Sequence, residues 1–527
     1  MEFGLDNVAV ETLDYRLALK RIANDLQGDF IYAPHLAAVF HRAGDDLWDR
    51  LRSVLRSGTF RPRLPITLEV PKLSGFPRPG SILWPLERLA YQVVVDRIAL
   101  NAETTLDRSR VFSCQLLSED PDGYMFAPAG QAYSQFKDKI AGLCRDSAYT
   151  HSVAADVASY FERLYQHVLV NLLHSAGCES LLVTFLEKVL LAFTQKESHG
   201  IVQGLFPSDF LGTFYLCAID AQHDSIGAPS VRYVDDMFVF FESEGAAKKH
   251  QVRLATWLRS DGLAVNEAKS GVRATGALQR EQTEVENLFE TAVAEVESEL
   301  DRADFYGSTI SWDVLYGDSD TIVEEPDEVE LVATKRLFDV QGLSGGLRKK
   351  VDTFCIAAFG AAEDDYALDY VVERFASMPY MAQPFAKYLK SLLPRQDKLV
   401  ERLSSYLSSD KLLFDYQRLW LYALLSLARN PGAGVMAAAL RDLTNPNLSP
   451  AVRVACAVLV GVHGSAPQRR ILRNHYQAES SDYVRAGILY AARNFPKPER
   501  ESCFTAWSGH DEVNSLIVRA AKKLEGA

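Results

Sequence analysis

The chain has 527 residues, of which 48% are hydrophobic and 24% charged, enough for roughly two or three globular domains. Its net charge of −13 is unusual for a protein that binds nucleic acid, and no apolar run approaches the roughly 18 residues of a membrane span. Seven scattered cysteines without a CxxC pair argue against a disulfide framework and a structural zinc site. With an acidic amino terminus unlike a signal peptide, these features predict a cytoplasmic protein without membrane contact.

The negative charge is concentrated in one segment. Residues 281–330 hold seventeen acidic residues and one basic residue, Arg302, which gives −16. The rest of the chain therefore sums to −13 + 16 = +3. Net charge bears on solubility and non-specific association rather than on fold, so it does not exclude a nucleic-acid site elsewhere.

Four zones follow one another along the chain. Residues 1–58 show helical apolar spacing, as in LDYRLALKRIANDL. In residues 59–280 short apolar strands alternate with helical stretches between Pro and Gly turns, which predicts an α+β domain. Residues 281–336 form an acidic linker, helical in period in its first half and loop-like in its second.

Residues 337–527 are helical in pattern throughout. Arg418, Arg453, Arg485 and Arg519 each precede or enter an apolar helix rich in small residues, at spacings of 35, 32 and 34 residues. Such a period without strand character predicts a solenoid of paired helices. The alternative is an irregular helical bundle in which the arginine spacing is a coincidence.

Within the α+β zone, the run VRYVDDMFVFF (residues 231–241) carries two adjacent carboxylates, Asp235 and Asp236. Two neighbouring acids in an apolar strand pair repel each other and lose hydration unless a cation or water reaches them. The pattern therefore predicts a cation site at a hairpin bend. The alternative is a solvated hairpin turn.

Three further stretches surround this one in sequence. Asp156 in VAADVASYFERLYQHVL follows a short strand-like stub, QGLFPS (residues 203–208) forms a turn before an apolar helix, and GLAVNEAKS (residues 262–270) presents Lys269. Taken singly, they are typical of a helix N-cap, a loop and a solvated lysine.

Taken together and in this order, the four stretches resemble the palm motifs of reverse transcriptases, over residues 59–272. Residues 69–99 resemble the fingers segment of these enzymes. FERLYQHVL and the helical carboxyl-terminal part look most like the bacterial abortive-infection group. The resemblance implies a fingers-palm domain followed by an all-α HEAT-like repeat domain that replaces the thumb, with residues 1–58 packed on the fingers. The sequence departs from the wider superfamily in having no recognisable thumb, RNase H, integrase or maturase-nuclease pattern.

The resemblance also implies a metal site. Asp156 and Asp235 correspond to the carboxylates that bridge two Mg²⁺ ions, for which Mn²⁺ can substitute, and Asp236 to a weaker or indirect ligand. Two metals held in this way would stabilise the attacking hydroxyl and the departing pyrophosphate.

Residues that meet the incoming deoxynucleotide follow from the same resemblance. Phe161 corresponds to the aromatic that excludes a 2′-hydroxyl, and Lys269 to a group that neutralises or protonates pyrophosphate. The remaining nucleotide-binding candidates are Gln203 and Gly204 along the nucleotide and Lys72 and Arg78 at the triphosphate.

The function implied is a DNA polymerase of antiphage defence that adds dNTPs without a template. It would start from a tyrosine, for which Tyr15 and Tyr32 are the first candidates, leave single-stranded DNA attached to the protein, and work as a homo-oligomer, a trimer or hexamer. One alternative is an enzyme of the same fold that copies a bound noncoding RNA. The other is a scaffold that binds partners through its solenoid and has lost catalysis.

Overall fold

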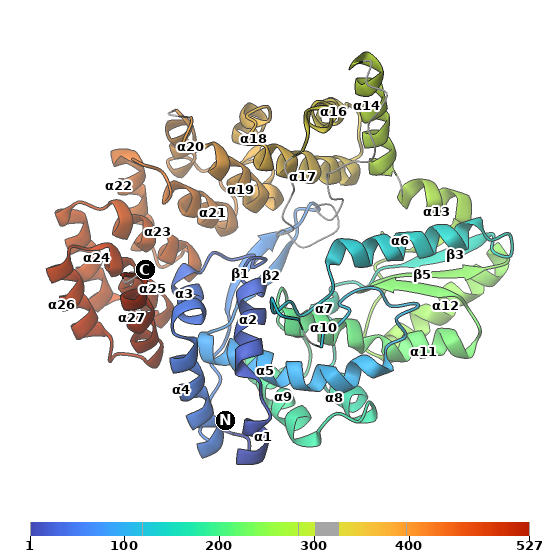
Figure 1. Cartoon of the computed structure of the whole chain (residues 1–527), viewed down its shortest axis with the longest axis horizontal. Coiled ribbons are helices and arrows are strands. Elements are labelled where there is room, and N and C mark those ends of the chain that lie inside the picture. Colours follow the sequence, from blue (N-terminus) through green and yellow to red (C-terminus); the bar gives the residue numbers. More distant parts are fainter. Residues whose placement is uncertain (1, 119, 283, 301–325, 397, 526–527) are drawn as a thin grey trace.

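The computed structural model describes the chain except for residues 1, 119, 283, 301–325, 397 and 526–527 (Figure 1). Most of the described chain is helical, and its strands form two antiparallel sheets. Among the described helices, none combines the length and apolar character needed to cross a bilayer.

Four helices form the amino-terminal part: α1 (Asn7–Glu11), α2 (Tyr15–Asp25), α3 (Pro34–Arg42) and α4 (Gly44–Ser57). The carboxylate of Asp14 caps α2 by accepting the backbone N–H groups of Arg16 and Leu17. These helices pack on α5 (Pro85–Ala102), which is buried along most of its length, as a central core helix is.

A two-stranded sheet precedes α5. Strand β1 (Ile66–Pro71) pairs antiparallel with β2 (Pro77–Ile82), and residues 72–76 form the exposed tip of this hairpin. Strand β1 also contacts helices of the carboxyl-terminal part of the chain.

The second sheet has four strands in the order β4-β5-β3-β6. They are β3 (His151–Ala155), β4 (Ser230–Tyr233), β5 (Asp236–Phe241) and β6 (Gly271–Ala274). Alternation along β5 buries both faces, since Phe238 and Phe240 join a cluster with α6 (Ala129–Arg145), and Met237 belongs to the main core, on the side of α12 (Glu244–Ser260). The sheet therefore has helices on both faces (Figure 1).

Other short elements complete this part of the chain. They are η1 (Glu103–Thr105), α7 (Tyr160–Arg163), α8 (Gln166–Ser175), α9 (Ser180–Phe193), α10 (Phe206–Tyr215), α11 (Cys217–Ser225) and α13 (Thr275–Gln282). Val157 and Val265 form an isolated bridge, and β6 follows Lys269.

The acidic segment is helical in its first half, where α14 (Glu284–Leu300) forms as its periodicity predicts. The second half, predicted as a loop, falls largely on residues 301–325, outside the described residues. Helix α16 (Glu328–Asp339) crosses the boundary predicted at residue 337, because Asp327 and Glu330 form a capping box that starts the helix earlier.

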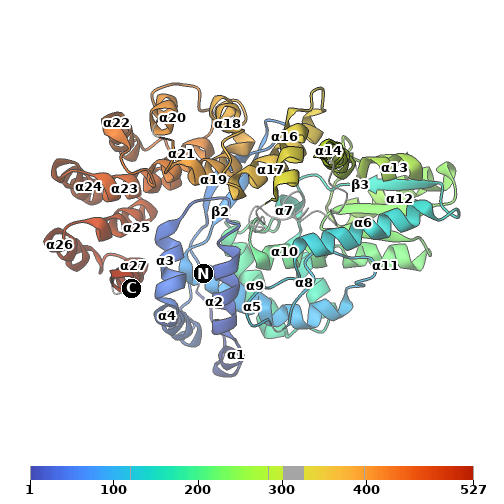
Figure 2. The ribbon, with the colours of Figure 1, turned by 45° about the horizontal axis from the view of Figure 1, so that its top comes forward.

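The helices from α16 onward are called the helical array here. After α16 it contains α17 (Gly345–Ala361), α18 (Leu368–Arg374), η2 (Pro379–Met381), α19 (Ala382–Leu392), α20 (Leu399–Leu407), α21 (Asp415–Leu425), α22 (Gly432–Leu443), α23 (Pro450–His463), α24 (Ala466–Ala478), α25 (Asp482–Ala491), η3 (Ala492–Asn494), α26 (Lys497–Trp507) and α27 (Glu512–Glu525). Helices α17, α19, α21, α23, α25 and α27 each pack on the next to form one row, and α20, α22 and α24 form a second row (Figure 2).

The four regularly spaced arginines lie on successive helices of the first row. Arg418 in α21 pairs with Asp442, which lies 24 residues further along the chain. Arg453 in α23 pairs with Glu479, which lies 26 residues further along. The other two differ, since Arg485 pairs with Asp482 of its own helix and Arg519 reaches α4. Two of the four arginines therefore share a structural role.

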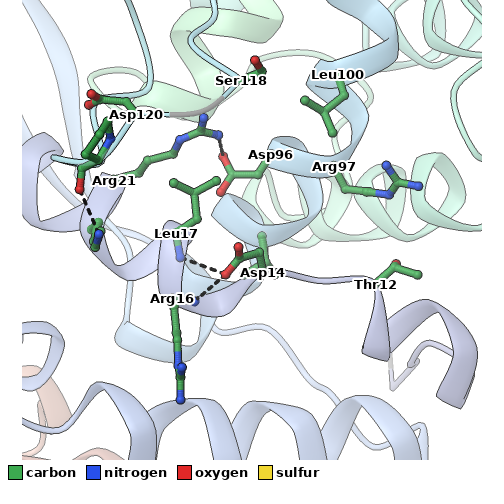
Figure 3. Close-up of a pocket in the computed structure, with 13 residues that line it drawn as sticks. Thr12, Asp14, Arg16, Leu17, Arg21, Asp96, Arg97, Leu100, Ser118 and Asp120 are labelled. Carbon is green, nitrogen blue, oxygen red and sulfur yellow. Dashed lines mark hydrogen bonds and ion pairs between the residues drawn. The ribbon is translucent and has the colours of Figure 1, made fainter.

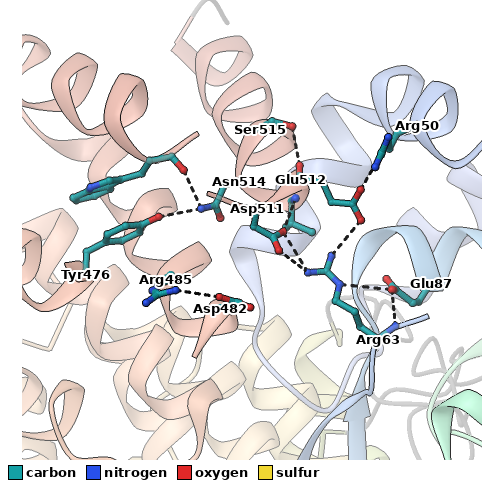
Figure 4. A network of polar contacts seen from close by, with 12 residues as sticks. Arg50, Arg63, Glu87, Tyr476, Asp482, Arg485, Asp511, Glu512, Asn514 and Ser515 are labelled. Carbon is teal, nitrogen blue, oxygen red and sulfur yellow. Dashed lines mark hydrogen bonds and ion pairs between the residues drawn. The ribbon is translucent and has the colours of Figure 1, made fainter. Parts of the chain in front are cut away.

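The last helix of the array docks on the amino-terminal part. Helix α27 packs against α3, and Arg63 links the two parts (Figure 4). Its Nη1 lies 3.2 Å from Asp511 Oδ2, its Nε lies 3.6 Å from Glu87 Oε1, and its guanidinium lies 4.0 Å from the ring centroid of Trp84. Burial raises the pKa of Glu87, and Arg63 opposes that rise. Arg63 therefore compensates a buried carboxylate while it holds α27 in place.

We predict that Arg63→Ala destabilises the folded chain by about 2 kcal/mol, because Glu87 loses its charged partner while it stays buried and keeps only the backbone N–H of residue 63. Urea unfolding followed by tryptophan fluorescence measures this loss. The control is Arg50→Ala, which removes an exposed pair with Glu512 and should cost less than about 1 kcal/mol. Equal losses in the two variants would contradict the role given to Arg63.

Candidate active site

The four-stranded sheet brings three predicted carboxylates together. Asp156 directly follows β3, Asp235 lies in the bend between β4 and β5, and Asp236 is the first residue of β5. Because Ala155 pairs with Met237 across β3 and β5, the antiparallel register sets Asp156 beside Asp236 at the same end of the sheet. The β3–β5 pairing thus joins carboxylates about eighty residues apart.

The bend that carries Asp235 is strained. Tyr233 pairs with Asp236, so Val234 and Asp235 alone make the turn, and Val234 has a φ of +52°. A β-branched residue rarely adopts this conformation, which is usual for Gly or Asn in two-residue hairpins. Two hydrogen bonds hold it: the Val234 N–H donates to Ser113 Oγ (2.8 Å), and the buried Arg232 donates from Nη1 to the Val234 carbonyl (2.8 Å). Strain held in this way is typical of functional sites.

Asp156 is held by residues of the 262–270 stretch. Its Oδ1 accepts a hydrogen bond from Asn266 Nδ2 (2.6 Å), its Oδ2 accepts one from Lys269 Nζ (2.9 Å), and its backbone N–H donates to Ser270 Oγ (3.0 Å). Burial disfavours the ammonium, but the bond to Asp156 and the neighbouring carboxylates raise the pKa of Lys269. Asn266 and Ser270 were not predicted as site residues, although polar residues flanking Lys269 were a signal for them.

The carboxylates repel one another. Burial first, and then the charges of Asp236 and Asp156, raise the pKa of Asp235 to about 7. Desolvation by neighbouring atoms and the charge of Asp156 raise the pKa of Asp236 to about 6. Lys269 and Lys350 oppose this rise, and part of the Asp236 side chain remains exposed to solvent. The sheet therefore concentrates negative charge that the nearby lysines only partly offset.

This donor set fits a hard divalent cation, since Mg²⁺ prefers carboxylate oxygens. Within the described part of the chain, no three His, Cys, Asp or Glu side chains are arranged to coordinate one metal ion. One oxygen of Asp156 is bonded to Lys269 instead.

The nucleotide-binding candidates other than Lys269 fall into two groups. In the first, Gly204 has a φ of +84°, and a Cβ there would lie 2.7 Å from the ring of Phe30. The guanidinium of Arg78 lies 4.4 Å from the centroid of the same ring. Phe30 thus joins the β1–β2 hairpin to the turn of Gln203 and Gly204, which the sequence did not predict.

The second group comprises Phe161 and Lys72. The carbonyl of Phe161, in α7, accepts the N–H of Ile201 (2.9 Å), and the Phe161 ring lies so close to α10 that a Cβ at Gly212 would be 2.8 Å from it. Lys72 is exposed at the hairpin tip, where its backbone pairs with Phe76 and Gly75.

The two candidate priming tyrosines lie elsewhere. Tyr15 stacks on Trp48 with ring centroids 4.9 Å apart and donates its hydroxyl to Asp45 (3.2 Å). Tyr32 lies 6.5 Å from the ring of Trp420 in α21, and burial raises its pKa. Their contacts join the amino-terminal helices to each other and to the helical array.

A cavity of about 750 Å³ lies between α2 and α5 (Figure 3). Its lining mixes both charges, and its buried pair Arg21–Asp96 has a separation of 2.8 Å. None of the predicted site residues lines this cavity, so it is separate from the carboxylates.

The part of the chain that carries the three carboxylates matches a known protein family. Residues 71–292 match the family model described as reverse transcriptase (RNA-dependent DNA polymerase). The chain contains a reverse transcriptase domain. All the predicted residues of the metal and nucleotide sites lie inside the reverse transcriptase domain, whereas Tyr15, Tyr32 and the whole helical array lie outside it.

Among solved structures, the chain is similar to a telomerase from Candida albicans, determined in complex with a TWJ fragment of telomeric RNA, with 11% sequence identity and a TM-score of 0.30. The alignment covers 82% of this chain but only 64% of the telomerase chain. No curated protein matches the chain.

Repulsion among the carboxylates of the reverse transcriptase domain should lower the thermal stability of the metal-free protein. We expect Asp235→Asn with Asp236→Asn to raise the melting temperature of metal-free protein by about 2 °C at pH 8. A carboxylate whose pKa is raised from 3.8 to about 7 destabilises the fold most above pH 7, and protonation removes this effect as the pH falls toward 3.8. The gain should therefore shrink between pH 7 and pH 4.

Thermal unfolding in a chelator, followed by circular dichroism at several pH values, measures this gain. Asp138→Asn, at an exposed position on α6, is the control and should change nothing. A gain independent of pH would contradict mutual repulsion as its cause.

Proposed function

We propose that the protein is a Mg²⁺-dependent DNA polymerase that adds deoxynucleotides to a growing strand. The observation that carries the proposal is the convergence of Asp156, Asp235 and Asp236 at one end of the sheet, with raised pKa values at the last two. Repulsion among these carboxylates destabilises the fold, and without a bound cation the nearby lysines offset it only in part. The same observation weighs against a scaffold that has lost catalysis.

The residues of the site divide the work of nucleotidyl transfer. The three carboxylates would hold Mg²⁺, which when bound neutralises the charge that develops on the phosphates. The attacking oxygen forms a bond to the α-phosphorus as the bond to the pyrophosphate oxygen breaks. Lys269, already bonded to Asp156, keeps an ammonium where the departing pyrophosphate can be neutralised or protonated.

Selection of the sugar is assigned to Phe161, and alignment of the nucleotide to Gln203 and Gly204. The backbone of Gly204 and its contact with Phe30 leave no space for a side chain there. Arg78, on the other side of this contact, and Lys72 at the hairpin tip are assigned to the triphosphate, since a guanidinium suits phosphate oxygens.

We further propose a tyrosine primer and synthesis without a template, with single-stranded DNA left on the protein, in a homo-oligomer that serves antiphage defence. The sequence resemblance to the abortive-infection group supports this, with the helical array taken as a HEAT-like repeat domain at residues 337–527 and the fingers and palm at residues 59–280. The docking of α27 on α3 agrees with an array that stays in place rather than opening as a clamp. Copying a bound noncoding RNA is the alternative on the same fold.

The test of the function is incubation of purified protein with Mg²⁺ and each labelled dNTP without primer, followed by a denaturing gel before and after protease. We expect labelled protein that protease converts to free DNA. Asp156→Asn, or Asp235→Asn with Asp236→Asn, should abolish labelling because an amide cannot hold the metal charge, while Asp138→Asn should retain it. Protein-free product from the unprimed reaction would reject protein priming, and wild-type rates in the double variant would reject the metal site.

The sugar assignment predicts that Phe161→Ala admits ribonucleotides, since the ring no longer meets the 2′-hydroxyl. We expect some loss of stability as well, because a packed aromatic is truncated. Competition between labelled dATP and ATP measures the selectivity. Gly212→Ala is a second variant, since its Cβ would displace the intact Phe161 ring. Unchanged selectivity in a folded Phe161→Ala protein would place the sugar filter on another residue.

A further inference from the structure

Helix α17 of the helical array carries three consecutive basic residues near its start: Arg348, Lys349 and Lys350. The helix lies next to the β1–β2 hairpin in both views of the molecule (Figures 1 and 2). It lies outside the matched reverse transcriptase domain, which ends at residue 292. Sequence motifs of that domain therefore could not reveal a role for it.

The three basic residues differ in their surroundings. Arg348 is bound within the array, where it donates to the carbonyls of Phe338 and Val340 and pairs with Asp352 at 2.6 Å. Lys349 is half-buried and Lys350 exposed, and in the described part of the chain neither forms an ion pair with an acidic side chain. Only the two lysines can thus offer their charge to a ligand.

Contacts place Lys349 at the hairpin. Its Nζ lies 5.8 Å from the ring centroid of Tyr380, which belongs to η2. The turn η2 packs against β1, and Val70 of β1 pairs with Arg78 of β2. Lys349 therefore lies beside a turn that packs on the hairpin strand paired with the strand of Arg78.

The charges of Arg78 and Lys269 act on Lys349: burial first, and then these two charges, lower its pKa. Lys350 follows Lys349 directly in α17. Cations from the hairpin, the sheet and α17 thus crowd one region. Lys349 and Lys350 form no ion pair with an acid in the described part of the chain, and their ammonium groups are stabilised when an anion of several charges binds between them.

We propose that Lys349, with Lys350 beside it, binds the β- and γ-phosphates of the incoming nucleotide, so that the helical array completes the nucleotide site of the reverse transcriptase domain. The inference rests on the proposed polymerase function and extends it to residues outside that domain. A lysine can serve there as a compact charge, whereas Arg78 can contact phosphate oxygens in pairs. The same phosphate chemistry occurs in a DNA strand, and the experiment separates the two ligands.

The test uses full-length protein with Lys349→Ala, Lys350→Ala and Lys349→Arg, and with Lys390→Ala as a control at an exposed position on α19. Fluorescently labelled dATP, the corresponding deoxynucleoside and a single-stranded oligonucleotide are titrated with Ca²⁺ present, which separates binding from turnover. We expect Lys349→Ala to weaken dATP binding about tenfold, the loss of one charged contact, and Lys350→Ala to weaken it less. Nucleoside binding should not change, and Lys349→Arg should restore most of the affinity.

Unchanged dATP affinity in both alanine variants would overturn the inference, as would an equal loss for the nucleoside. A loss confined to the oligonucleotide would overturn it in favour of a strand-binding site. Lys349 is half-buried, so Lys349→Ala could fail to fold. In that case the dATP affinity of the Lys350→Ala variant tests the inference. The proposed function is tested separately: wild-type protein that incorporates no nucleotide but loses dATP affinity on Lys349→Ala would reject the polymerase and keep the binding site.

Discussion

The repulsion among three carboxylates at one end of a small sheet is the constraint on which the rest of the site depends. The β3–β5 register sets Asp156 beside Asp236, and the strained turn at Val234 fixes Asp235 next to them. The strain persists because Ser113 and the buried Arg232 hold both polar groups of the Val234 backbone. A fold that keeps like charges together through a strained turn carries an electrostatic cost, which a bound cation would offset.

Positive charge reaches this region from three separate parts of the chain. Lys269 comes from the stretch before β6, Arg78 from the β1–β2 hairpin, and Lys349 from the helical array. A site assembled from such distant segments keeps its geometry only if the parts are fixed relative to one another. The contacts of Phe30 with Arg78 and Gly204, and of its carbonyl with Trp420, are part of that fixation.

The second part of the fixation lies at the far end of the array. Arg63 joins Asp511 of the array to Glu87 of the central helix α5, so the array is anchored at its last helix as well as beside the hairpin. A chain anchored at both ends differs from a hinged clamp, which must open and close around a duplex. The arrangement suits an enzyme that holds a nucleotide and a short strand in one place.

The sequence by itself determined which carboxylates are candidates for the site, the order of the motifs and the helical character of residues 337–527. Local patterns suffice for these features, because adjacent acids in an apolar run and apolar periodicity are visible without knowledge of contacts. Tertiary structure alone decided that Phe30 packs on Gly204, that Asn266 bonds to Asp156, and that Lys349 lies beside Tyr380 of a turn that packs on the hairpin. Such contacts join segments far apart in the chain, and their position depends on how the sheet and the helices pack, which no local pattern encodes.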